Sequence, residues 1–323
     1  MRCGRALYAL ALGLPLAAQQ IPVIRVPVRL VSLPTLVFSS ENRLILNLRA
    51  EDFHIVDNGR LQTVILDTNV APVSVAIAVQ ANQDVREYLP FIAKVGSAID
   101  ALLVGETGEA VILTYGEEVK VANSFESQDV RSSVKKISVA GKQARMLDAG
   151  SRAIGLLAKR PRSRTRILIF VGQSMDRGSE SSIMSLIEDA DRENVTIHTL
   201  ALPLFGKAFV SDTFSLQGAE KGGLKGGVDL GKLVSVLDRS GRVETEADPF
   251  SVLTAATGGL QLHFRNQHQL EDAIAAIGVD LRSAYLLSYY PSSTENGHHS
   301  VKVEVDVPGA RVYTRRGYWL STE

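Results

Sequence analysis

Residues 80–84 are the stretch of this sequence whose side chains and position best suit binding chemistry. They read Q-A-N-Q-D and follow directly after a mostly apolar run, V-S-V-A-I-A-V. Amide side chains both donate and accept hydrogen bonds, whereas an ionised carboxylate only accepts them. The stretch therefore predicts a place where a ligand is held through hydrogen bonds.

Sequence patterns that usually accompany catalysis or metal binding are missing elsewhere. The six histidines form no H-E-x-x-H and no cluster with cysteine, and neither G-x-S-x-G nor G-x-x-x-x-G-K-[ST] occurs. We interpret His298 and His299 as solvated turn residues, and His198 as a core histidine with satisfied hydrogen bonds. The basic run 159–166 is interpreted as a solvated turn between a helix and a strand. No set of side chains can be assigned as a nucleophile, its general base and the group that orients that base, so we do not expect an enzyme.

The polar stretch follows a segment with the composition of a central strand. Residues 73–79 have no polar face, which is typical of a parallel strand covered by helices on both sides. Strand and helix patterns then alternate as far as residue 283, with a tight antiparallel partner expected across Gly116. This order predicts an α/β fold with a doubly wound, mostly parallel sheet. Ligands of such sheets bind beyond the carboxyl ends of the strands, where residues 80–84 are expected.

Two β-rich segments flank this α/β region, which we place at 71–283. In residues 19–70, Asn58-Gly59 between apolar runs is a strong hairpin signal, and residues 284–323 contain further strands with no helix between them. Each segment is too small to bury a core alone, so we expect both chain ends to join in one smaller antiparallel, sandwich-like β domain. The irregular, glycine-rich segment 203–247 is expected to be a surface insert in the α/β domain.

Residues 1–18 have the layout of a cleavable signal peptide. Arg2 and Arg5 precede an apolar core of about 13 residues, which is too short to span a bilayer. No later run reaches about 18 apolar residues, so we expect no membrane insertion. Cleavage would remove Cys3, the only cysteine, and leave a net charge of about −2, which gives no electrostatic reason to expect nucleic acid. We therefore expect a secreted or periplasmic protein.

Several longer stretches resemble one known family. They are L-R-A-E-D-F-H-I-V-D-N-G at 48–59, T-G-G at 257–259, A-Y-L-L-S-Y-Y-P at 284–291 and P-G-A-R-V-Y-T-R-R-G-Y-W at 308–319. With the order of strand, polar loop, helix and edge hairpin, the chain resembles von Willebrand factor A-like domain proteins. The flanks resemble the secreted VWFA-related acidobacterial family. The resemblance covers almost the whole mature chain and implies an A-type α/β domain.

The family resemblance also implies a metal-ion-dependent adhesion site. In that site an Asp-x-Ser-x-Ser loop, a threonine from a second loop and an aspartate after the fourth strand hold Mg²⁺. Carried over by position, these ligands fall on Gln80, Asn82, Asp84, Ala144 and Gln173. Only Asp84 keeps an acidic or hydroxyl group, and we interpret nearby Asp176 as a solvated residue at the start of the next helix. Because Mg²⁺ gives up its waters reluctantly and is usually held by one or two carboxylates, we expect neither metal nor cofactor here.

These five positions are therefore expected to bind a protein partner without a metal ion, through the carboxyl-end face of the sheet. The sequence predicts an exported, non-enzymatic, adhesion-like interaction module. Two alternatives stay open. One is a structural or scaffolding envelope protein with a vestigial A-type face and contacts made by the β domain, and the other is a divergent A-type domain that still binds Mg²⁺.

Overall fold

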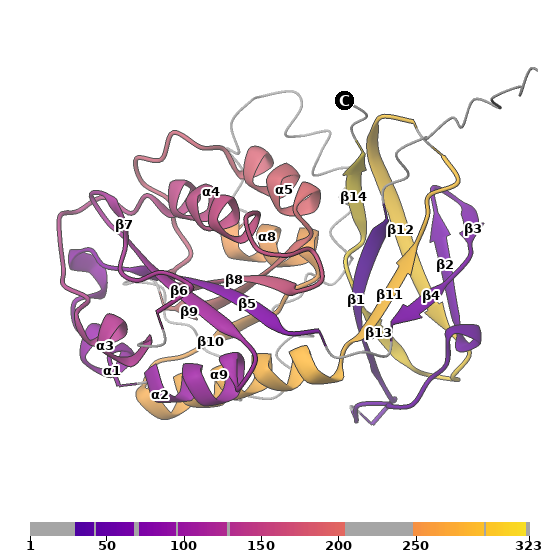
Figure 1. Cartoon of the computed structure of the whole chain (residues 1–323), viewed down its shortest axis with the longest axis horizontal. Coiled ribbons are helices and arrows are strands. Elements are labelled where there is room, and N and C mark those ends of the chain that lie inside the picture. The colour runs from indigo at the N-terminus through magenta and orange to yellow at the C-terminus, as the bar shows by residue number, and fades with distance from the viewer. Residues whose placement is uncertain are drawn as a thin grey trace, which may run out of the picture.

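The computed structural model describes residues 30–320, except for positions 42, 68–70, 95, 128–129, 204–247 and 294. The signal peptide lies outside the described residues, as does the predicted insert apart from Pro203, so both stay predictions. Figure 1 shows an α/β domain beside a smaller domain made of strands.

Six strands of the described chain form the central sheet of the α/β domain, in the order β10-β9-β8-β5-β6-β7. The parallel strands are β5 (Val73–Gln80), β6 (Glu109–Tyr115), β8 (Thr165–Gln173), β9 (Val195–Leu202) and β10 (Gln261–His263). The edge strand β7 (Val119–Val121) is antiparallel to β6, as expected across Gly116. The sequence-based prediction of a mostly parallel, doubly wound sheet is therefore confirmed.

Helices cover both faces of this sheet (Figure 1). One face carries α4 (Met146–Leu157), α5 (Ile183–Arg192) and α8 (Pro249–Thr257). The other carries α1 (Leu89–Ile92), α2 (Gly96–Ile99), the π-helix η3 (Asp100–Val104), α3 (Val130–Lys135) and α9 (Gln267–Ser283). Alternate residues of β5 enter the two cores, since Ala76 and Ala78 pack on the α4 side and Val75, Ile77 and Val79 on the α9 side. This is why the strand has no polar face.

The β domain contains two antiparallel sheets, ordered β13-β1-β11-β4 and β14-β12-β2-β3. From the N-terminal flank come β1 (Val31–Phe38), β2 (Phe53–Asp57), β3 (Arg60–Gln62) and β4 (Ile65–Asp67), with a short 3-10 helix, η1 (Ala50–Asp52), before β2. From the C-terminal flank come β11 (Tyr285–Tyr289), β12 (Gly297–Val305), β13 (Arg311–Tyr313) and β14 (Gly317–Leu320). Each sheet therefore mixes strands from both chain ends, as predicted. Asn58 and Gly59, with φ of 45° and 79°, form the expected hairpin turn between β2 and β3.

A buried ion pair joins the two domains. Arg315, which precedes β14, donates from Nη1 to Asp191 Oδ1 of α5 at 2.9 Å, and both side chains are 3% exposed. Arg315 Nη2 also donates to Asn194 Oδ1 at 3.1 Å, and the Trp319 N–H donates to Asp191 Oδ2 at 2.9 Å. The carboxylate of Asp191 is thus bonded to two parts of the β domain, which fixes that domain against α5.

The basic run 159–166 follows α4 and extends into β8, and three of its arginines are not solvated. Arg160 and Arg164 both pair with Glu109, at 2.6 and 3.2 Å, with 24% and 17% of their side chains exposed. Arg166 is 4% exposed at its side chain and pairs with Glu193 at 3.2 Å. The interpretation as a solvated turn was wrong for these residues, because their partners lie on other elements.

The predictions for two of the histidines had different outcomes. His198 is buried in β9, which confirms it as a core residue, and the Leu260 N–H donates to its Nδ1 at 3.0 Å, which satisfies that one ring nitrogen. Burial lowers its pKa to about 4. His299, interpreted as a solvated turn residue, is instead 1% exposed. It lies in β12 opposite Tyr318 of β14, and His298 lies opposite Trp319. This strand pairing decides the burial of His299.

His299 belongs to a buried polar cluster around Asp57. Its Nδ1 lies 3.0 Å from Asp57 Oδ1, and its Nε2 lies 2.8 Å from the Glu295 carbonyl oxygen. The hydroxyls of Tyr289 and Tyr318 donate to Asp57 Oδ2 at 3.0 and 2.8 Å. Burial raises the pKa of Tyr289, with the neighbouring Tyr318 and Asp57 adding to the shift, so its hydroxyl remains a donor. Three side chains therefore depend on one buried carboxylate.

Replacing Asp57 with asparagine should lower the free energy of unfolding of the β domain by about 3 kcal/mol or more, because the buried charge shared by these groups is lost. Urea unfolding can be followed by the fluorescence of Trp319, the single tryptophan, which lies on β14. Asp306→Asn is the matched control, since its partner His54 is 3.0 Å away and the two side chains are 63% and 41% exposed. The control should cost less than about 1 kcal/mol. Equal losses in the two variants would contradict a stabilising role for the cluster.

Candidate functional site

Three loops meet at the carboxyl edge of the sheet and contain all five positions implied by the resemblance. Gln80 is the last residue of β5 and Gln173 is the last residue of β8. The two strands are parallel neighbours, and their register places Val79 opposite Val171. The third loop leads into α4, where Ala144 forms an isolated antiparallel bridge with Arg177, N···O 3.1 and 2.9 Å. The fold thus places together positions that are far apart in the sequence.

A continuous series of hydrogen bonds, here called the loop network, links Gln173, Gln80, Asn82, Asp84 and Arg177. The Gln173 N–H donates to Gln80 Oε1 at 2.6 Å, and Gln80 Nε2 donates to Asn82 Oδ1 at 2.9 Å. Asn82 Nδ2 donates to Asp84 Oδ2 at 3.1 Å, and Arg177 Nη2 donates to the same oxygen at 2.9 Å. Every bond joins a donor to an acceptor, so the network is self-consistent.

The two ends of the loop network fix the orientation of the amides between them. A backbone N–H can only donate, so Gln80 must present its oxygen to Gln173 and its nitrogen to Asn82. Asn82 must then present its oxygen to Gln80, which leaves its nitrogen for the carboxylate of Asp84. A carboxylate at position 80 or 82 would lack the required donor. The network therefore needs neutral amides at both positions.

Arg177 is the component of this site that the sequence did not indicate. Its side chain is 46% exposed and pairs with Asp84, whose side chain is 35% exposed. Its Nη1 also donates to the Lys142 carbonyl oxygen at 3.2 Å, and that oxygen accepts a bond from Asn82 Nδ2 at 3.3 Å as well. The pairing follows from the bridge between Ala144 and Arg177, for which the sequence carries no local signal.

Most of the predicted binding positions are buried. Gln80, Asn82 and Ala144 are 0% exposed and Gln173 is 2% exposed, with Gln173 Nε2 donating to the Pro203 carbonyl oxygen at 3.2 Å. Of the five positions, only Asp84 reaches the surface. The partner-binding role expected of them stays a prediction, and the four buried residues can act in it only by holding the loops in place.

Asp176 has a different position from the one expected. It accepts at Oδ1 from the Leu147 N–H at 2.9 Å, in the first turn of α4, and from the Ser179 hydroxyl at 2.7 Å. The next helix, α5, starts at Ile183 and is capped by Ser182 instead. A carboxylate satisfies unpaired N–H groups at a helix N-terminus, which explains why Asp176 is drawn to α4.

Gly172 leaves room for Gln80 beneath the loops, next to the buried Tyr115. Gly172 precedes Gln173, and a Cβ atom there would lie 2.6 Å from both Gln80 Cβ and the Tyr115 hydroxyl oxygen. Any larger residue at Gly172 would therefore displace Gln80. Burial raises the pKa of Tyr115, with the charge of Asp176 adding to it, so this buried hydroxyl stays neutral at physiological pH.

The side chains at this edge do not fit the Mg²⁺ implied by the resemblance. Mg²⁺ takes oxygen ligands, but Gln80 Oε1, Asn82 Oδ1 and Asp84 Oδ2 each already accept a hydrogen bond. The nearest formal charge to Asp84 is the cation of Arg177, which would repel a metal ion. Across the described part of the chain, no group of three or more His, Cys, Asp or Glu residues is arranged to hold a metal.

Asn82→Asp should destabilise the α/β domain by about 2–4 kcal/mol at pH 7, because a buried carboxylate would replace the donor that faces Asp84. The neighbouring charge and burial would raise the pKa of the new carboxyl above its unfolded value. The loss relative to wild type should therefore shrink as pH falls towards 4. Circular dichroism during urea unfolding measures both effects.

The adjacent exposed amide provides the control, because Gln83→Glu makes the same chemical change in solvent. It should change stability by no more than about 0.5 kcal/mol. Equal effects of the two substitutions, or a loss for Asn82→Asp that does not depend on pH, would contradict the loop network.

The sequence matches no protein-family model and no curated protein. Among solved structures it is similar to a von Willebrand factor type A protein from Catenulispora acidiphila, at 9% identity and a TM-score of 0.46 over 92% of this chain and 76% of that one. An aerotolerance-related membrane protein from Bacteroides fragilis is 12% identical, with a TM-score of 0.43 over 65% and 98% of the two chains. Proximal thread matrix protein 1 of the mussel byssus, with a zinc-occupied MIDAS motif, is 10% identical, with a TM-score of 0.44 over 69% and 49%. Similarities this distant do not assign a family, so the fold is described from the strand order and loop positions of this chain itself.

Proposed function

We propose that this protein is an exported, non-enzymatic interaction module that binds a protein partner at the carboxyl edge of its α/β sheet without a metal ion. The observation that carries the proposal is the loop network, in which amides and Arg177 stand where metal ligands are expected. The network holds the three loops together by internal hydrogen bonds. A partner would then meet a surface that is already ordered.

The exposed groups over the loop network supply its recognition chemistry. Asp84 and Arg177 are partly exposed, and Gln83 and Lys142 beside them are exposed. In a metal-bound adhesion site the ion would attract a carboxylate of the partner. Here Lys142 provides the positive charge beside the Asp84–Arg177 ion pair, which favours a partner with acidic and hydrogen-bonding groups on a broad surface.

Export is part of this proposal and is supported by the layout of residues 1–18. Within the described residues, no helix combines the length and the apolar composition needed to cross a membrane. We propose a secreted or periplasmic location.

The β domain is the alternative docking site, for a structural or scaffolding role. Leu61 is 70% exposed, Tyr290 is 55% exposed and Ile65 is 42% exposed on this domain. Exposed apolar side chains mark a protein contact where they form one continuous patch, so the structural alternative requires that these residues act together.

Millimolar Mg²⁺, Mn²⁺ or Ca²⁺ should not raise the melting temperature above that of a control matched for ionic strength. A ligand at about 100 times its dissociation constant would add about 2.7 kcal/mol, which thermal unfolding detects readily. An upward shift specific to one ion and lost in Asp84→Asn would show that a metal site survives and would refute the metal-free proposal.

Lys142→Glu should reduce partner capture about tenfold, the factor equivalent to 1.4 kcal/mol, when the variant is used as bait on the secreted and periplasmic fraction of the source cells. Only the backbone of Lys142 takes part in the loop network, so the fold should be unchanged. Leu61→Glu on the β domain is the control and should capture the same protein as wild type. The reverse result, with capture lost only in Leu61→Glu, would support the structural alternative instead.

A further inference from the structure

The edge strand β7 presents backbone groups that pair with no other described strand. The Gly116 N–H donates to the Glu118 carbonyl, and the Ala122 N–H donates to the Ile112 carbonyl, at 3.3 and 2.8 Å. In an antiparallel pair, hydrogen-bonded and non-hydrogen-bonded positions alternate. The N–H and C=O groups of Val119 and Val121 therefore point away from β6, towards the open edge.

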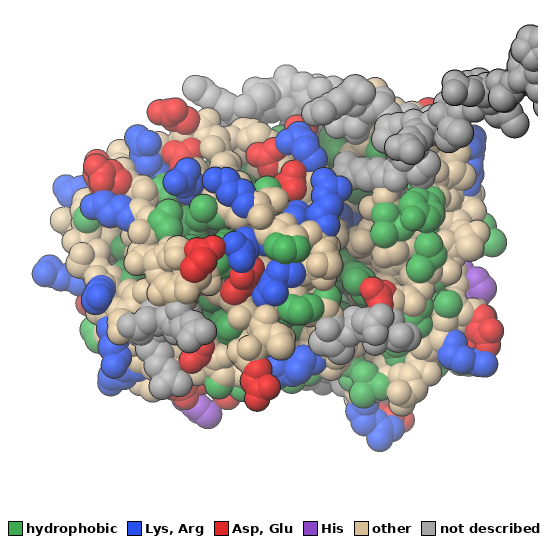
Figure 2. Space-filling view, in the orientation of Figure 1, with side chains coloured by type: hydrophobic (Ala, Val, Ile, Leu, Met, Phe, Trp, Pro, Cys, Tyr) green, Lys and Arg blue, Asp and Glu red, His purple; other side chains and the backbone are tan. Residues whose placement is uncertain are grey.

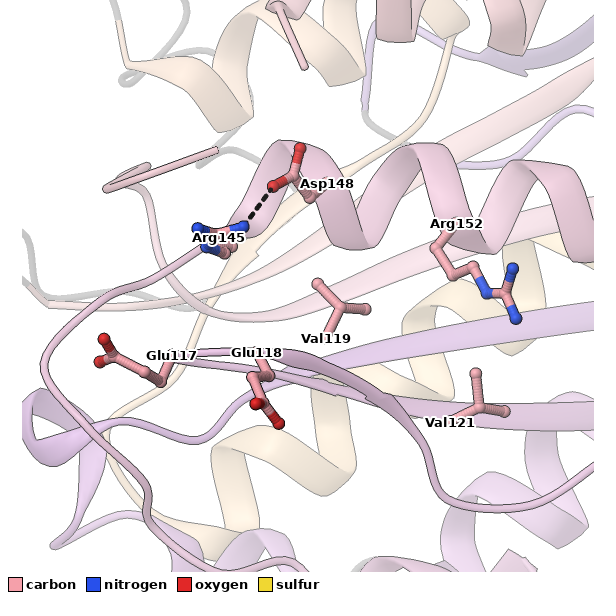
Figure 3. A pocket seen from close by; sticks show the side chains of 7 residues that line it. All are labelled: Glu117, Glu118, Val119, Val121, Arg145, Asp148 and Arg152. Carbon is pink, nitrogen blue, oxygen red and sulfur yellow. Dashed lines mark ion pairs between the residues drawn. The ribbon is translucent and has the colours of Figure 1, made fainter. Parts of the chain in front are cut away.

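A groove of about 670 Å³ runs beside this edge, between β7 and α4 (Figure 3). The side chains of Val119 and Val121 rise from β7 towards the helix, and Arg152 reaches down from α4 towards the strand. Arg145, just before α4, and Asp148, in its first turn, also line the groove. Figure 2 shows hydrophobic side chains in the hollow between α4 and β7, with Lys and Arg side chains around it.

The acidic residues around the groove are already engaged within the chain. Glu117 accepts the Lys142 and Gln143 N–H groups at 3.2 and 3.5 Å. Glu118 points away from α4 in Figure 3 and pairs with Lys120 at 3.4 Å. Asp148 accepts the Ser181 N–H at 2.9 Å. Glu118 is thus paired with a cation outside the groove, and Glu117 and Asp148 accept backbone N–H groups, while Asp148 also lies 3.6 Å from Arg145, which lines the groove.

The two arginines of the groove are less completely engaged. Arg152 is exposed and makes no ion pair with any described residue. Arg145 forms a long ion pair with Asp148, with 3.6 Å between Arg145 Nη1 and Asp148 Oδ2. The buried Nε of Arg145 has no hydrogen-bond partner in the described chain. The groove thus offers positive charge above two valines, next to unpaired backbone groups.

From this combination we propose that the groove binds an extended segment of a partner protein, which adds to the outer edge of β7 as a further strand. The backbone of the segment pairs with Val119 and Val121, alternate apolar side chains pack on the same two residues, and an acidic side chain binds Arg152 and Arg145. β-Strand addition draws affinity from main-chain hydrogen bonds and specificity from alternate side chains. This surface lies on the side edge of the sheet, separate from the loop network.

Selection of random nine-residue peptides displayed against the immobilised full-length protein tests this proposal. The enriched peptides should alternate apolar residues and carry an acidic residue. A synthetic peptide of an enriched sequence should bind Arg152→Glu at least tenfold more weakly than wild type. It should bind Lys159→Glu normally, because Lys159 is exposed just beyond α4 and does not line the groove.

The peptide itself can report strand pairing without any change to the protein fold. N-methylation at the alternate peptide positions whose N–H groups face β7 should abolish binding. Methylation at the intervening positions should leave binding unchanged.

A substitution in β7 tests the same pairing from the side of the protein. Val119→Pro removes one outward N–H and should weaken binding about tenfold, whereas Val119→Ile keeps that N–H and should bind normally.

Four results would overturn the proposal. The first is that no peptide sequence is enriched above background, and the second is that the enriched peptide binds wild type and Arg152→Glu equally. The third is that binding does not depend on which peptide positions are N-methylated. The fourth is that synthetic peptides from residues 204–247 bind at this edge, which would make the occupant part of this chain. A peptide lost in Lys142→Glu but not in Arg152→Glu would belong to the surface over the loop network, and would also count against the groove.

Discussion

The hydrogen bond from the Gln173 N–H to Gln80 Oε1 is the constraint on which the arrangement of the candidate site depends. It ties the ends of β5 and β8 together and orients the first amide, and every later bond of the loop network follows from that orientation. Burying an amide costs free energy only where a donor or acceptor is left unpaired. Because the donors of Gln80 and Asn82 find acceptors, these residues can lie fully buried at the end of a sheet.

Charge at this edge is supplied by the chain itself. A metal ion would need anionic ligands and would bring a cation to the surface, whereas here Asp84 pairs with Arg177 and the remaining members of the loop network are neutral. The guanidinium lies partly in solvent, so the positive charge is present without a dehydration step. In the proposed function, an acidic partner would meet this ion pair and the exposed Lys142 instead of a metal ion.

Buried carboxylates organise the rest of the molecule in a similar way. Asp57 holds His299 and two tyrosine hydroxyls inside the β domain, and Asp191 holds Arg315 and the Trp319 N–H across the domain boundary. In each case one anion satisfies donors from separate strands or loops, so removing it would leave several buried groups unpaired. The Asp57 contacts join the two sheets of the β domain, and the Asp191 contacts fix that domain against the α/β domain.

Local periodicity and local backbone preference were enough to predict the central strand, the carboxyl-edge position of residues 80–84, the antiparallel edge strand and the Asn58-Gly59 turn. Four features became visible only in the folded chain: Gln80 and Asn82 are buried, Arg177 pairs with Asp84, His299 is a core residue, and β7 borders a groove with α4. These features depend on strand register and loop bridges between residues up to about 240 positions apart, such as Asp57 and His299. Spacing along the chain predicts which face of an element is apolar, but it does not predict which distant side chain will supply the matching donor or charge.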